Sequence, residues 1–408
     1  MKSLRIKKCR LCYSENLQKM GSLGMIAISN FTKRPLEGKK MPLELVWCEN
    51  CDLYQLAHNP PQNELYKRFY WYESGTNKVI ADDLKSIVQS INSIVKLGPG
   101  DTWIDLGAND GTLLSFVSEE IFRVGVEPAK NLISKLRQYC HIAYPEFWES
   151  KKVNVMGAKV ITAIGMFYDS PDPNKFIKKV ANTLDKDGIF VAQLMTLEPM
   201  LKYNDVGNIC HEHLEYYTYK SLVYLYEKNG LEIFNVEQNR INGGSYRLYA
   251  RKYRIGSVRI SENIAPQKVK AFFEKAKEIK KETVAFIKEA RRAKQLVYGY
   301  GASTKFNTIL QYYGLDSKII RAIADKDPKK LSKYTIKTGI PIILEEIARK
   351  SADYFFVGPW GFIDFFINKE RQWLQDGGKF IISIPKFKII AWPISESGIL
   401  VGEKKKII

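Results

Sequence analysis

Apolar residues in the middle of the chain form short runs that alternate with stretches of helical spacing. Residues 103–106 form one such run and predict a buried strand, and glycines at positions 107 and 111 then frame a tight turn. Helical spacing begins at Thr112, and a second apolar run at residues 123–126 ends in Glu127. A strand, a glycine turn, a helix and a second strand in this order predict the opening of a Rossmann-type α/β unit.

The same alternation continues through the central part of the chain. It predicts helices over residues 79–96, 131–139 and 176–184, and strands over residues 159–164 and 189–195. Two further runs, at 231–236 and 245–250, flank Asn242-Gly243-Gly244 and predict a closing hairpin. Units of this kind give a mostly parallel sheet that is covered by helices on both faces.

A second strand-glycine-helix pattern follows a long charged helix, which is predicted over residues 266–292 and joins two domains. The pattern lies at residues 296–305, and a strand at 319–324 then ends at Asp325. With the apolar runs at 354–357 and 380–385, it predicts a C-terminal Rossmann-like α/β domain. The GxGA turn alone is weak evidence for a dinucleotide, and Lys305 after it favours an anion such as a substrate phosphate.

Four of the six cysteines form two pairs, Cys9-x-x-Cys12 and Cys48-x-x-Cys51. Two such pairs can close a tetrahedral thiolate site, so they predict a structural zinc module. A redox pair is the alternative, but two copies that flank one small module favour zinc. Cys140 and Cys210 are left as free thiols.

Composition narrows the class of protein. Of the 408 residues, 45% are hydrophobic and 12% aromatic, which predicts a globular chain of two or three domains. No apolar run is long enough to cross a bilayer, and the basic N-terminus leads into cysteines and not into a signal sequence. We therefore expect a cytoplasmic protein.

The net charge of +19 raises the question of nucleic acid. The lysines are spread along the chain and interleaved with acids, and only Lys7-Lys8 and Lys404-Lys405-Lys406 form compact runs. This distribution favours a solvated lysine-rich surface over a nucleic-acid groove. An anionic small substrate such as a nucleotide-sugar is compatible with either.

The loop after the first strand indicates the class of cofactor. Its acids would repel a pyrophosphate but suit a cationic ligand with an amino group, and an acid after the second strand can accept hydrogen bonds from a ribose. An ordinary strand-turn-helix is the alternative. The loop resembles motif I of class I S-adenosylmethionine (SAM) methyltransferases, in which the closing hairpin also occurs. We expect the cofactor to contact Asp105, Gly107, Asn109, Asp110, Gly111, Thr112, Leu113 and Glu127.

Two of the four histidines lie within three residues, in His211-Glu212-His213. In an extended segment both imidazoles share one side and Glu212 faces the other. Three interpretations stay open: a metal chelate, which lacks an evident third ligand, a structural pair, and a general base that a carboxylate orients. The aromatic cluster at residues 66–72 is expected to pack, although one of its phenols could line the site.

Together these motifs resemble the sugar C-methyltransferases that act on nucleotide-linked keto-deoxysugars. The resemblance covers essentially the whole chain and rests on six motifs in order: the paired CxxC, D-L-G-x-N-D-G, G-V-E-P, H-E-H, G-G-S-x-R and G-Y-G-A-x-x-K. It implies an α/β fold with a class I SAM-methyltransferase Rossmann-like domain, an N-terminal zinc-binding module and a C-terminal Rossmann-like domain without a nicotinamide. We expect these at residues 66–255, 1–65 and 256–408.

The resemblance also implies residue roles. His213 corresponds to the base, with His211, Glu212 and Tyr72 as the other catalytic candidates. The substrate is expected to meet Tyr70, Cys210, Asn242, Gly243, Arg247, Tyr300 and Lys305. The chain departs from the family at Cys210, where a tyrosine is usual, at Asn242, where a histidine is usual, and at Trp360-Gly361, where a W-N pair is usual. These departures leave the sugar and the methylated atom open.

The expected reaction is C-methylation of a keto-sugar through an enolate that His213 generates. Methylation of a hydroxyl would use the same base. Two other classes compete: a methyltransferase acting on RNA or protein, and a binding protein that has lost its ligands. The crowded chemistry around residues 208–217 argues against the last. The expected partners are SAM, zinc and a small nucleotide-sugar, and the sequence does not indicate an oligomeric state.

Overall fold

The computed structural model describes residues 5–67 and 69–394, so the basic run Lys404-Lys405-Lys406 lies outside the described residues. The chain divides into two compact units. Unit 1 comprises the chain up to Lys19 together with Leu45–Pro199 and Glu212–Ile264. Unit 2 comprises Met20–Glu44, Met200–His211 and the chain from Ala265 onward. Each unit therefore combines segments that are distant in sequence.

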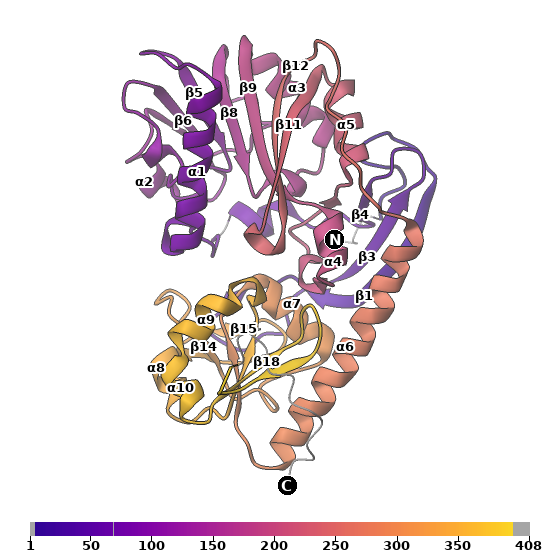
Figure 1. Cartoon of the computed structure of the whole chain (residues 1–408), viewed down its shortest axis with the longest axis vertical. Helices are drawn as coiled ribbons and strands as arrows, with labels where there is room; N and C mark the ends of the chain where they lie inside the picture. Colours follow the sequence, from indigo (N-terminus) through magenta and orange to yellow (C-terminus); the bar gives the residue numbers. More distant parts are fainter. Residues whose placement is uncertain (1–4, 68, 395–408) are drawn as a thin grey trace. The chain divides into compact units, whose positions relative to one another are not determined.

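The centre of unit 1 is a seven-stranded sheet in the order β11-β12-β9-β8-β5-β6-β7 (Figure 1). Its strands are β5 (Thr102–Leu106), β6 (Phe122–Val126), β7 (Ile142–Tyr144), β8 (Ala158–Ile164), β9 (Leu184–Met195), β11 (Leu231–Asn239) and β12 (Ser245–Lys252). The first five in chain order pair in parallel, whereas β12 is antiparallel to both β9 and β11. The predicted parallel sheet and closing hairpin are confirmed, and the edge strand β7 is an addition.

Two of the helices predicted for unit 1 are wrong in extent. The helix expected from Thr112 is only the 3-10 turn Leu114–Phe116, and the one expected over 131–139 is only α2 (Ile133–Leu136). A helix that runs back along the five residues of β5 must cover about 17 Å, which takes about eleven helical residues. The segment between Gly111 and Phe122 must also turn into β6, so it is too short.

The remaining helices of unit 1 pack on the sheet. They are α1 (Lys78–Ile94), α3 (Pro173–Thr183) and α5 (Tyr219–Lys228), and α4 (Leu197–Lys202) crosses the division between the units. Asn77 caps α1 and Asp172 caps α3 through their side chains. One face of the sheet presents Ile104 and Leu106 to the same apolar core as α3 and α5. Alternation along β5 turns Asp105 to the opposite face.

A smaller sheet carries the N-terminal cysteines. Its order is β1-β3-β4-β10, with β1 (Leu17–Ala27), β3 (Lys40–Cys48), β4 (Tyr54–Leu56) and β10 (Glu215–Tyr216). The division between the units falls within β1 and within β3. Strand β10 comes from the segment directly after His211-Glu212-His213 and pairs with β4, with Glu215 opposite Gln55.

Unit 2 holds a six-stranded sheet in the order β16-β14-β13-β17-β18-β19. Its strands are β13 (Val297–Tyr300), β14 (Ile323–Asp325), β16 (Ile342–Leu344), β17 (Tyr354–Val357), β18 (Lys379–Ile382) and β19 (Lys388–Ile390). All pair in parallel except β19. A two-stranded sheet joins β2 (Phe31–Thr32) to β15 (Tyr334–Thr335). The predicted Rossmann-like arrangement is confirmed.

The helices of unit 2 include the predicted long one. They are α6 (Pro266–Arg292), α7 (Thr304–Tyr313), α8 (Glu345–Arg349), α9 (Ile363–Lys369) and α10 (Arg371–Gln375). Helix α6 forms one uninterrupted rod of 27 residues (Figure 1). Among the described residues, none of the helices combines the length and the apolar character that crossing a bilayer requires.

Candidate functional site

The turn after β5 is built from residues that adopt left-handed backbone conformations. Gly107 has φ 65° and Gly111 has φ 86°, and Asn109 between them has φ 53°. A Cβ on Gly107 would lie 2.7 Å from the Met166 side chain, so the position requires glycine. The amides of Gly107 and Ala108 both donate to the carbonyl of Val126, at 2.8 and 3.1 Å, which fixes the turn against β6.

Glu127 closes this turn from the end of β6. Its Oε2 accepts from the Asn109 amide at 2.9 Å and its Oε1 from the Ala129 amide at 2.8 Å. Burial raises the pKa of Glu127 to about 7, and the two backbone donors oppose that rise. A carboxylate has more acceptor sites than these two bonds use, so Glu127 fits the role of holding two ribose hydroxyls.

Asp105 is placed differently. Its Oδ1 accepts from the Thr162 hydroxyl at 2.7 Å within the sheet, and burial raises the pKa of Asp105 to about 7. Trp103 Nε1 donates to the same hydroxyl at 3.1 Å. Asp105 therefore joins neighbouring strands beneath the turn, which makes it a support of the loop as well as a candidate contact for the cofactor.

The segment of residues 70–76, called here the tyrosine segment, is fastened across the turn. Asn109 Oδ1 accepts from the Ser74 amide at 3.0 Å, and Asp110 Oδ2 accepts from the Gly75 amide at 2.9 Å. Asn109 Nδ2 also donates to the Tyr72 carbonyl at 3.1 Å. A Cβ on Gly75 would lie 2.8 Å from the Thr112 hydroxyl oxygen, so the two segments are in close contact. Asn109 and Asp110 thus hold the tyrosine segment, a role that the sequence did not indicate.

Two further contacts anchor the same segment. Asn131 forms reciprocal bonds with Tyr70, accepting from its amide at 2.9 Å and donating to its carbonyl at 3.0 Å. Lys135 lies 2.6 Å from Glu73. The side chain of Tyr72 keeps 45% of its surface exposed. Neither Asn131 nor Lys135 belongs to a motif, so sequence reasoning missed both.

The second part of the site in unit 1 is the segment around His213. The ring of His213 is buried and packs edge-to-face on Tyr168, with the centroids 4.6 Å apart. The Leu214 amide donates to the Tyr168 carbonyl at 2.9 Å, and Tyr66 Oη donates to the Glu212 carbonyl at 3.1 Å. The backbone is therefore held on both sides of the imidazole. Tyr168 carries no sequence signal for this role.

Tyr70 relates this segment to the cofactor turn. Burial raises the pKa of its hydroxyl well above the usual value, and the charges of Asp169, Glu212 and Glu127 raise it further. The phenol thus lies within electrostatic range of both Glu127 and Glu212. It stays neutral across the physiological range and is a hydrogen-bond donor for a group that gains negative charge.

The predicted extended conformation of His211-Glu212-His213 is replaced by bends, and a strand begins only at Glu215. His211 and His213 are nevertheless both buried, at 2% and 8% exposure, while Glu212 is half-buried. His211 and the buried Cys210 belong to unit 2, whereas Glu212 and His213 belong to unit 1. The two histidines are therefore held by different parts of the fold.

Within unit 2, the segment before His211 meets the start of α7. Lys305 Nζ donates to Asn208 Oδ1 at 2.7 Å, and the charge of Lys305 opposes the rise that burial causes in the pKa of Asp205. The rings of Tyr203 and Trp360 lie 5.5 Å apart. The structure thus places Lys305 in a polar cluster at the N-terminal end of a helix, which is suited to an anion.

Two of the residues expected at the substrate lie in packed surroundings. Tyr300 is fully buried among Phe355, Phe366 and Phe380, and its hydroxyl donates to Glu370 at 2.6 Å. Arg247 is buried and bonds Asp83 and Gln193, each at 2.9 Å. These contacts give both side chains structural partners, and a contact of either with the substrate stays a prediction.

The Asn242-Gly243-Gly244 turn joins β11 to β12. Asn242 has φ 54° and Gly243 has φ 92°. A Cβ on Gly244 would lie 2.5 Å from the Pro199 side chain. The glycines are therefore required by the positive φ angles of the turn and by the close approach of Pro199. Whether Asn242 and Gly243 also contact a substrate stays a prediction.

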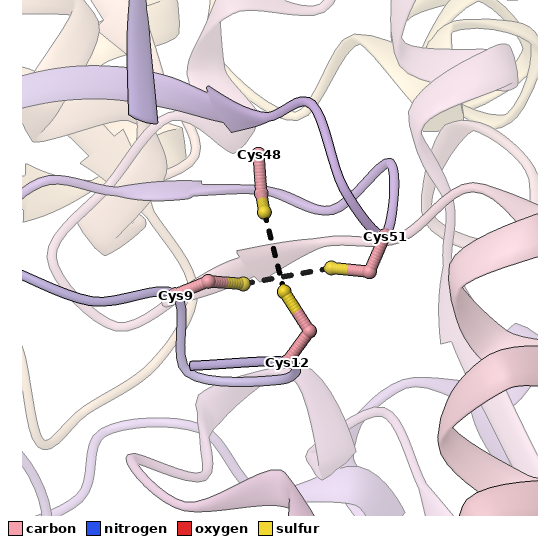
Figure 2. Close-up of side chains that lie close together, drawn as sticks. All are labelled: Cys9, Cys12, Cys48 and Cys51. Carbon is pink, nitrogen blue, oxygen red and sulfur yellow. Dashed lines mark hydrogen bonds between the residues drawn. The ribbon is translucent and has the colours of Figure 1, made fainter. Parts of the chain in front are cut away.

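The four cysteines of the N-terminal pairs converge on one point (Figure 2). All four sulfur atoms lie within 4.8 Å of one another, with Cys9 to Cys51 at 3.5 Å and Cys12 to Cys48 at 3.4 Å. Tetrahedral Zn–S bonds of about 2.3 Å place sulfurs about 3.8 Å apart, so the set fits zinc with a small expansion. The hydrogen bond from Cys51 lowers the pKa of Cys9 to about 5.

Neighbouring groups complete this centre. The Leu11 amide and Gln55 Nε2 donate to Cys9 Sγ at 3.4 and 3.1 Å. Such donors orient thiolates and offset their charge. No second group of three or more potential ligands occurs in the part of the chain that the structure describes, which leaves the metal interpretation of His211 and His213 without a ligand set.

Three family models match the chain in succession. A "Putative zinc binding domain" matches residues 9–66, a "Methyltransferase domain" matches residues 77–236, and a "C-methyltransferase C-terminal domain" matches residues 240–385. The C-methyltransferase NovU of Streptomyces niveus is 25% identical over 426 residues, covering 95% of this chain and 97% of that protein.

Solved structures resemble parts of the chain. The magnesium protoporphyrin IX methyltransferase of Synechocystis PCC 6803 with bound SAH has 12% identity and a TM-score of 0.35, over 43% of this chain and 88% of that one. A SAM-dependent methyltransferase of Clostridium acetobutylicum ATCC 824 has 12% identity and a TM-score of 0.35, over 42% of this chain and 92% of that one.

Proposed function

Since this chain is a SAM-dependent methyltransferase with the domain families of C-methyltransferases, we propose that its acceptor is a carbon atom of a nucleotide-linked keto-deoxysugar. The observation that carries the proposal is the buried His213 in unit 1, whose ring packs on Tyr168 and whose neighbouring carbonyl accepts from Tyr66. The backbone of His213 is held on both sides, Tyr168 packs on its ring, and Tyr70 packs on Tyr66 nearby, an arrangement that suits proton abstraction next to a carbonyl.

The chemistry requires two groups. A ketone acidifies the neighbouring C–H bond, but a positioned base must still remove the proton and a donor must stabilise the enolate oxygen. His213 is the base, and the neutral phenol of Tyr70 is the donor. Because the hydroxyl of Tyr70 resists ionisation, it keeps its proton while negative charge develops on the substrate.

SAM, when bound, would supply a sulfonium-linked methyl group, which would bond to the enolate carbon while the sulfur leaves as the neutral thioether of SAH. The chain's own contribution is to hold the two reactants. Glu127 takes the ribose, and the glycines at 107 and 111 give the turn the left-handed backbone that lies beside it. The tyrosine segment is bonded across that turn, and partial exclusion of water there would favour the reaction of an enolate with a methyl group on a sulfonium, because both charges are lost in the step.

The nucleotide part of the substrate needs a cation. Lys305 supplies it in this proposal, and Asn208 fixes the ammonium group. Cys210 and Asn242, where the family usually has tyrosine and histidine, would then select the sugar. We retain the domain boundaries 1–65, 66–255 and 256–408 and a cytoplasmic location as parts of the same proposal, the latter because thiolate zinc sites suit a reducing compartment.

Isotope exchange tests the proposed base. The wild type, incubated with a keto-deoxysugar nucleotide in deuterated water without SAM, should exchange the hydrogen next to the carbonyl. His213→Asn should lose both this exchange and methyl transfer, with SAM affinity within about twofold of wild type. His141→Asn is the matched control, because His141 stacks on Phe122 away from this segment.

Two results would contradict the proposal in different ways. Full methyl transfer by His213→Asn would remove the histidine from the mechanism. Methyl transfer without exchange, with the label recovered on oxygen, would establish O-methylation as the reaction.

A further inference from the structure

The zinc module and the catalytic segment share one sheet in unit 1. Strand β10 begins two residues after His213 and pairs with β4, and the Leu56 amide donates to the Leu214 carbonyl at 2.9 Å. Strand β4 follows directly on the second cysteine pair, and the Cys48 amide donates to the Leu53 carbonyl at 2.9 Å. The turn that holds two cysteines thus continues into the strand that fixes His213.

One buried side chain ties the other cysteine pair to the same strand. Gln55 is fully buried and donates to Cys9 Sγ at 3.1 Å. Its Oε1 accepts from the Arg10 amide at 3.1 Å and from Arg10 Nη1 at 3.2 Å. Both polar atoms of the Gln55 amide are therefore hydrogen-bonded, Nε2 to Cys9 and Oε1 to Arg10.

Arg10 carries the connection to β10. Its Nε lies 3.7 Å from Glu215 Oε1, and the two side chains are 4% and 0% exposed. Nη1 donates to the Leu56 carbonyl at 2.8 Å, and Nη2 donates to Asn59 Oδ1 at 2.7 Å. The Glu215 carboxylate forms no hydrogen bond with any residue in the described part of the chain, so Arg10 is the cation that compensates its charge.

From these contacts we infer that Glu215, Arg10 and Gln55 are positioning residues that fix His213 through the zinc centre. The inference rests on the proposed role of His213. A closed thiolate site cannot take part in methyl transfer, but it can hold Gln55 and Arg10, and these hold β10 in register. Removal of one partner of a buried ion pair leaves an uncompensated charge, so the segment has to move when the connection is broken.

Histidine NMR tests the inference, because the chain has only four histidines. The full chain is labelled with ¹³C-histidine, and the His213 signal is assigned with His213→Asn. Glu215→Gln keeps the shape of the side chain and removes its charge, and Gln55→Leu removes the link to Cys9. Both variants should shift or broaden the His213 signal and leave the His141 signal in place. Both should also release zinc to a chelating dye faster than wild type.

Glu232→Gln is the matched control. Glu232 is likewise a fully buried carboxylate of unit 1, and Arg251 bonds it at 2.8 Å, but it lies on β11 away from the cysteines. We expect this variant to leave the His213 signal and the rate of zinc release unchanged. A shift of His213 in the control, or a shift of His213 and His141 together in Glu215→Gln, would show general loosening and overturn the inference.

Kinetics supply a second readout. With a keto-sugar nucleotide that the wild type methylates, Glu215→Gln should lower kcat about a hundredfold, since a misplaced base costs that much, while KM for SAM stays within about twofold. An unshifted His213 signal in both Glu215→Gln and Gln55→Leu would overturn the inference. If His213→Asn retained methyl transfer, the proposed base would fail while the NMR result would still decide the connection to zinc.

Discussion

Two turns in this chain follow the same sequence pattern and end in different chemistry. After β5 in unit 1, Glu127 closes the glycine turn, and after β13 in unit 2, Asp325 closes another by accepting from the Ala302 amide at 2.6 Å. In unit 2 Lys330 adds itself to the turn, donating to the Ala302 carbonyl at 2.9 Å and lying 3.8 Å from Asp325. Among the described residues, no cation pairs with Glu127.

The difference shows what separates a ligand site from a fold element. A strand, a glycine turn and an acid are enough to build the crossover, and unit 2 satisfies its acid internally. In unit 1 the acid is buried without a cation, and its pKa is raised to about 7. Such a group gains from hydroxyl donors that a ligand brings, whereas Asp325 has its lysine already. A ligand site therefore requires a buried polar group whose hydrogen bonds or charge the protein itself does not satisfy.

Removal of Lys330 should have the largest effect on stability, because it breaks the contacts of Lys330 with Asp325 and with the Ala302 carbonyl in unit 2. Lys330→Met keeps the alkyl chain but leaves the buried Asp325 without its cation, which should destabilise unit 2 by about 3 kcal/mol. Thermal unfolding followed by calorimetry measures the loss. The control is Lys318→Met at an exposed position, and equal stability of the two variants would contradict the assigned closure.

Substitution of the acid in each turn should show which turn binds SAM. Glu127→Ala should weaken SAM binding by about 2 kcal/mol, or roughly thirtyfold, because two charge-assisted hydrogen bonds are lost. Asp325→Asn should leave SAM affinity unchanged. Isothermal titration calorimetry measures the SAM affinity of both variants. An equal loss of affinity in the two would contradict the assignment of SAM to the turn that Glu127 closes.

The raised pKa of Glu127 also predicts a pH dependence of SAM affinity. Ribose hydroxyls donate to the ionised carboxylate, so binding favours the form that dominates above about pH 7. Affinity should increase about tenfold from pH 6 to pH 8 and then level off. The stability of the ligand-free protein should depend on pH in the opposite direction. The carboxyl group favours folding while it is protonated, and that contribution to stability is lost as the pH rises through about 7.

Glu127→Gln should flatten the pH profile of SAM binding, measured by calorimetry at each pH, while Asp105 still titrates. If SAM affinity depended on pH as steeply in this variant as in the wild type, the titrating group would be a residue other than Glu127.

The smallest effect concerns the tyrosine segment, which is fastened across the first turn. Asn131→Ala removes both bonds to Tyr70 and should loosen the tyrosine segment. SAM affinity should fall by about 1 kcal/mol, roughly fivefold, because the segment must be ordered when the ligand binds. Amide hydrogen exchange of residues 70–76 should rise in parallel, and unchanged exchange would show that Asn131 does not hold the segment.

The sequence predicted those features that depend on local chemistry. Glycines with left-handed conformations, an acid after a strand and paired cysteines each carry their reason in neighbouring residues, and the structure brings the four cysteines together as expected. The helix expected after Gly111 failed because its length is set by β5 and β6, and not by its own periodicity. Local spacing does not contain that constraint.

Other features could not be predicted because their partners are far away in sequence. Tyr300 lies within a glycine-rich motif, and its neighbours in sequence do not indicate that Glu370 and three phenylalanines surround it. Tyr168 meets His213, and Gln55 meets Cys9, only because the sheets bring them together. Nothing in the residues around these positions indicates such contacts.

The pairing of β4 with β10 has a consequence for how the protein is made. The ribosome finishes Cys51 about 160 residues before it reaches Glu215, which at ordinary rates of synthesis is an interval of roughly 10 to 30 seconds. During that interval Arg10 has no carboxylate partner, and β4 presents an open edge that other nascent chains can join. Chaperone demand should therefore concentrate on the N-terminal module, which is synthesised first but completed only when the middle of the chain has emerged.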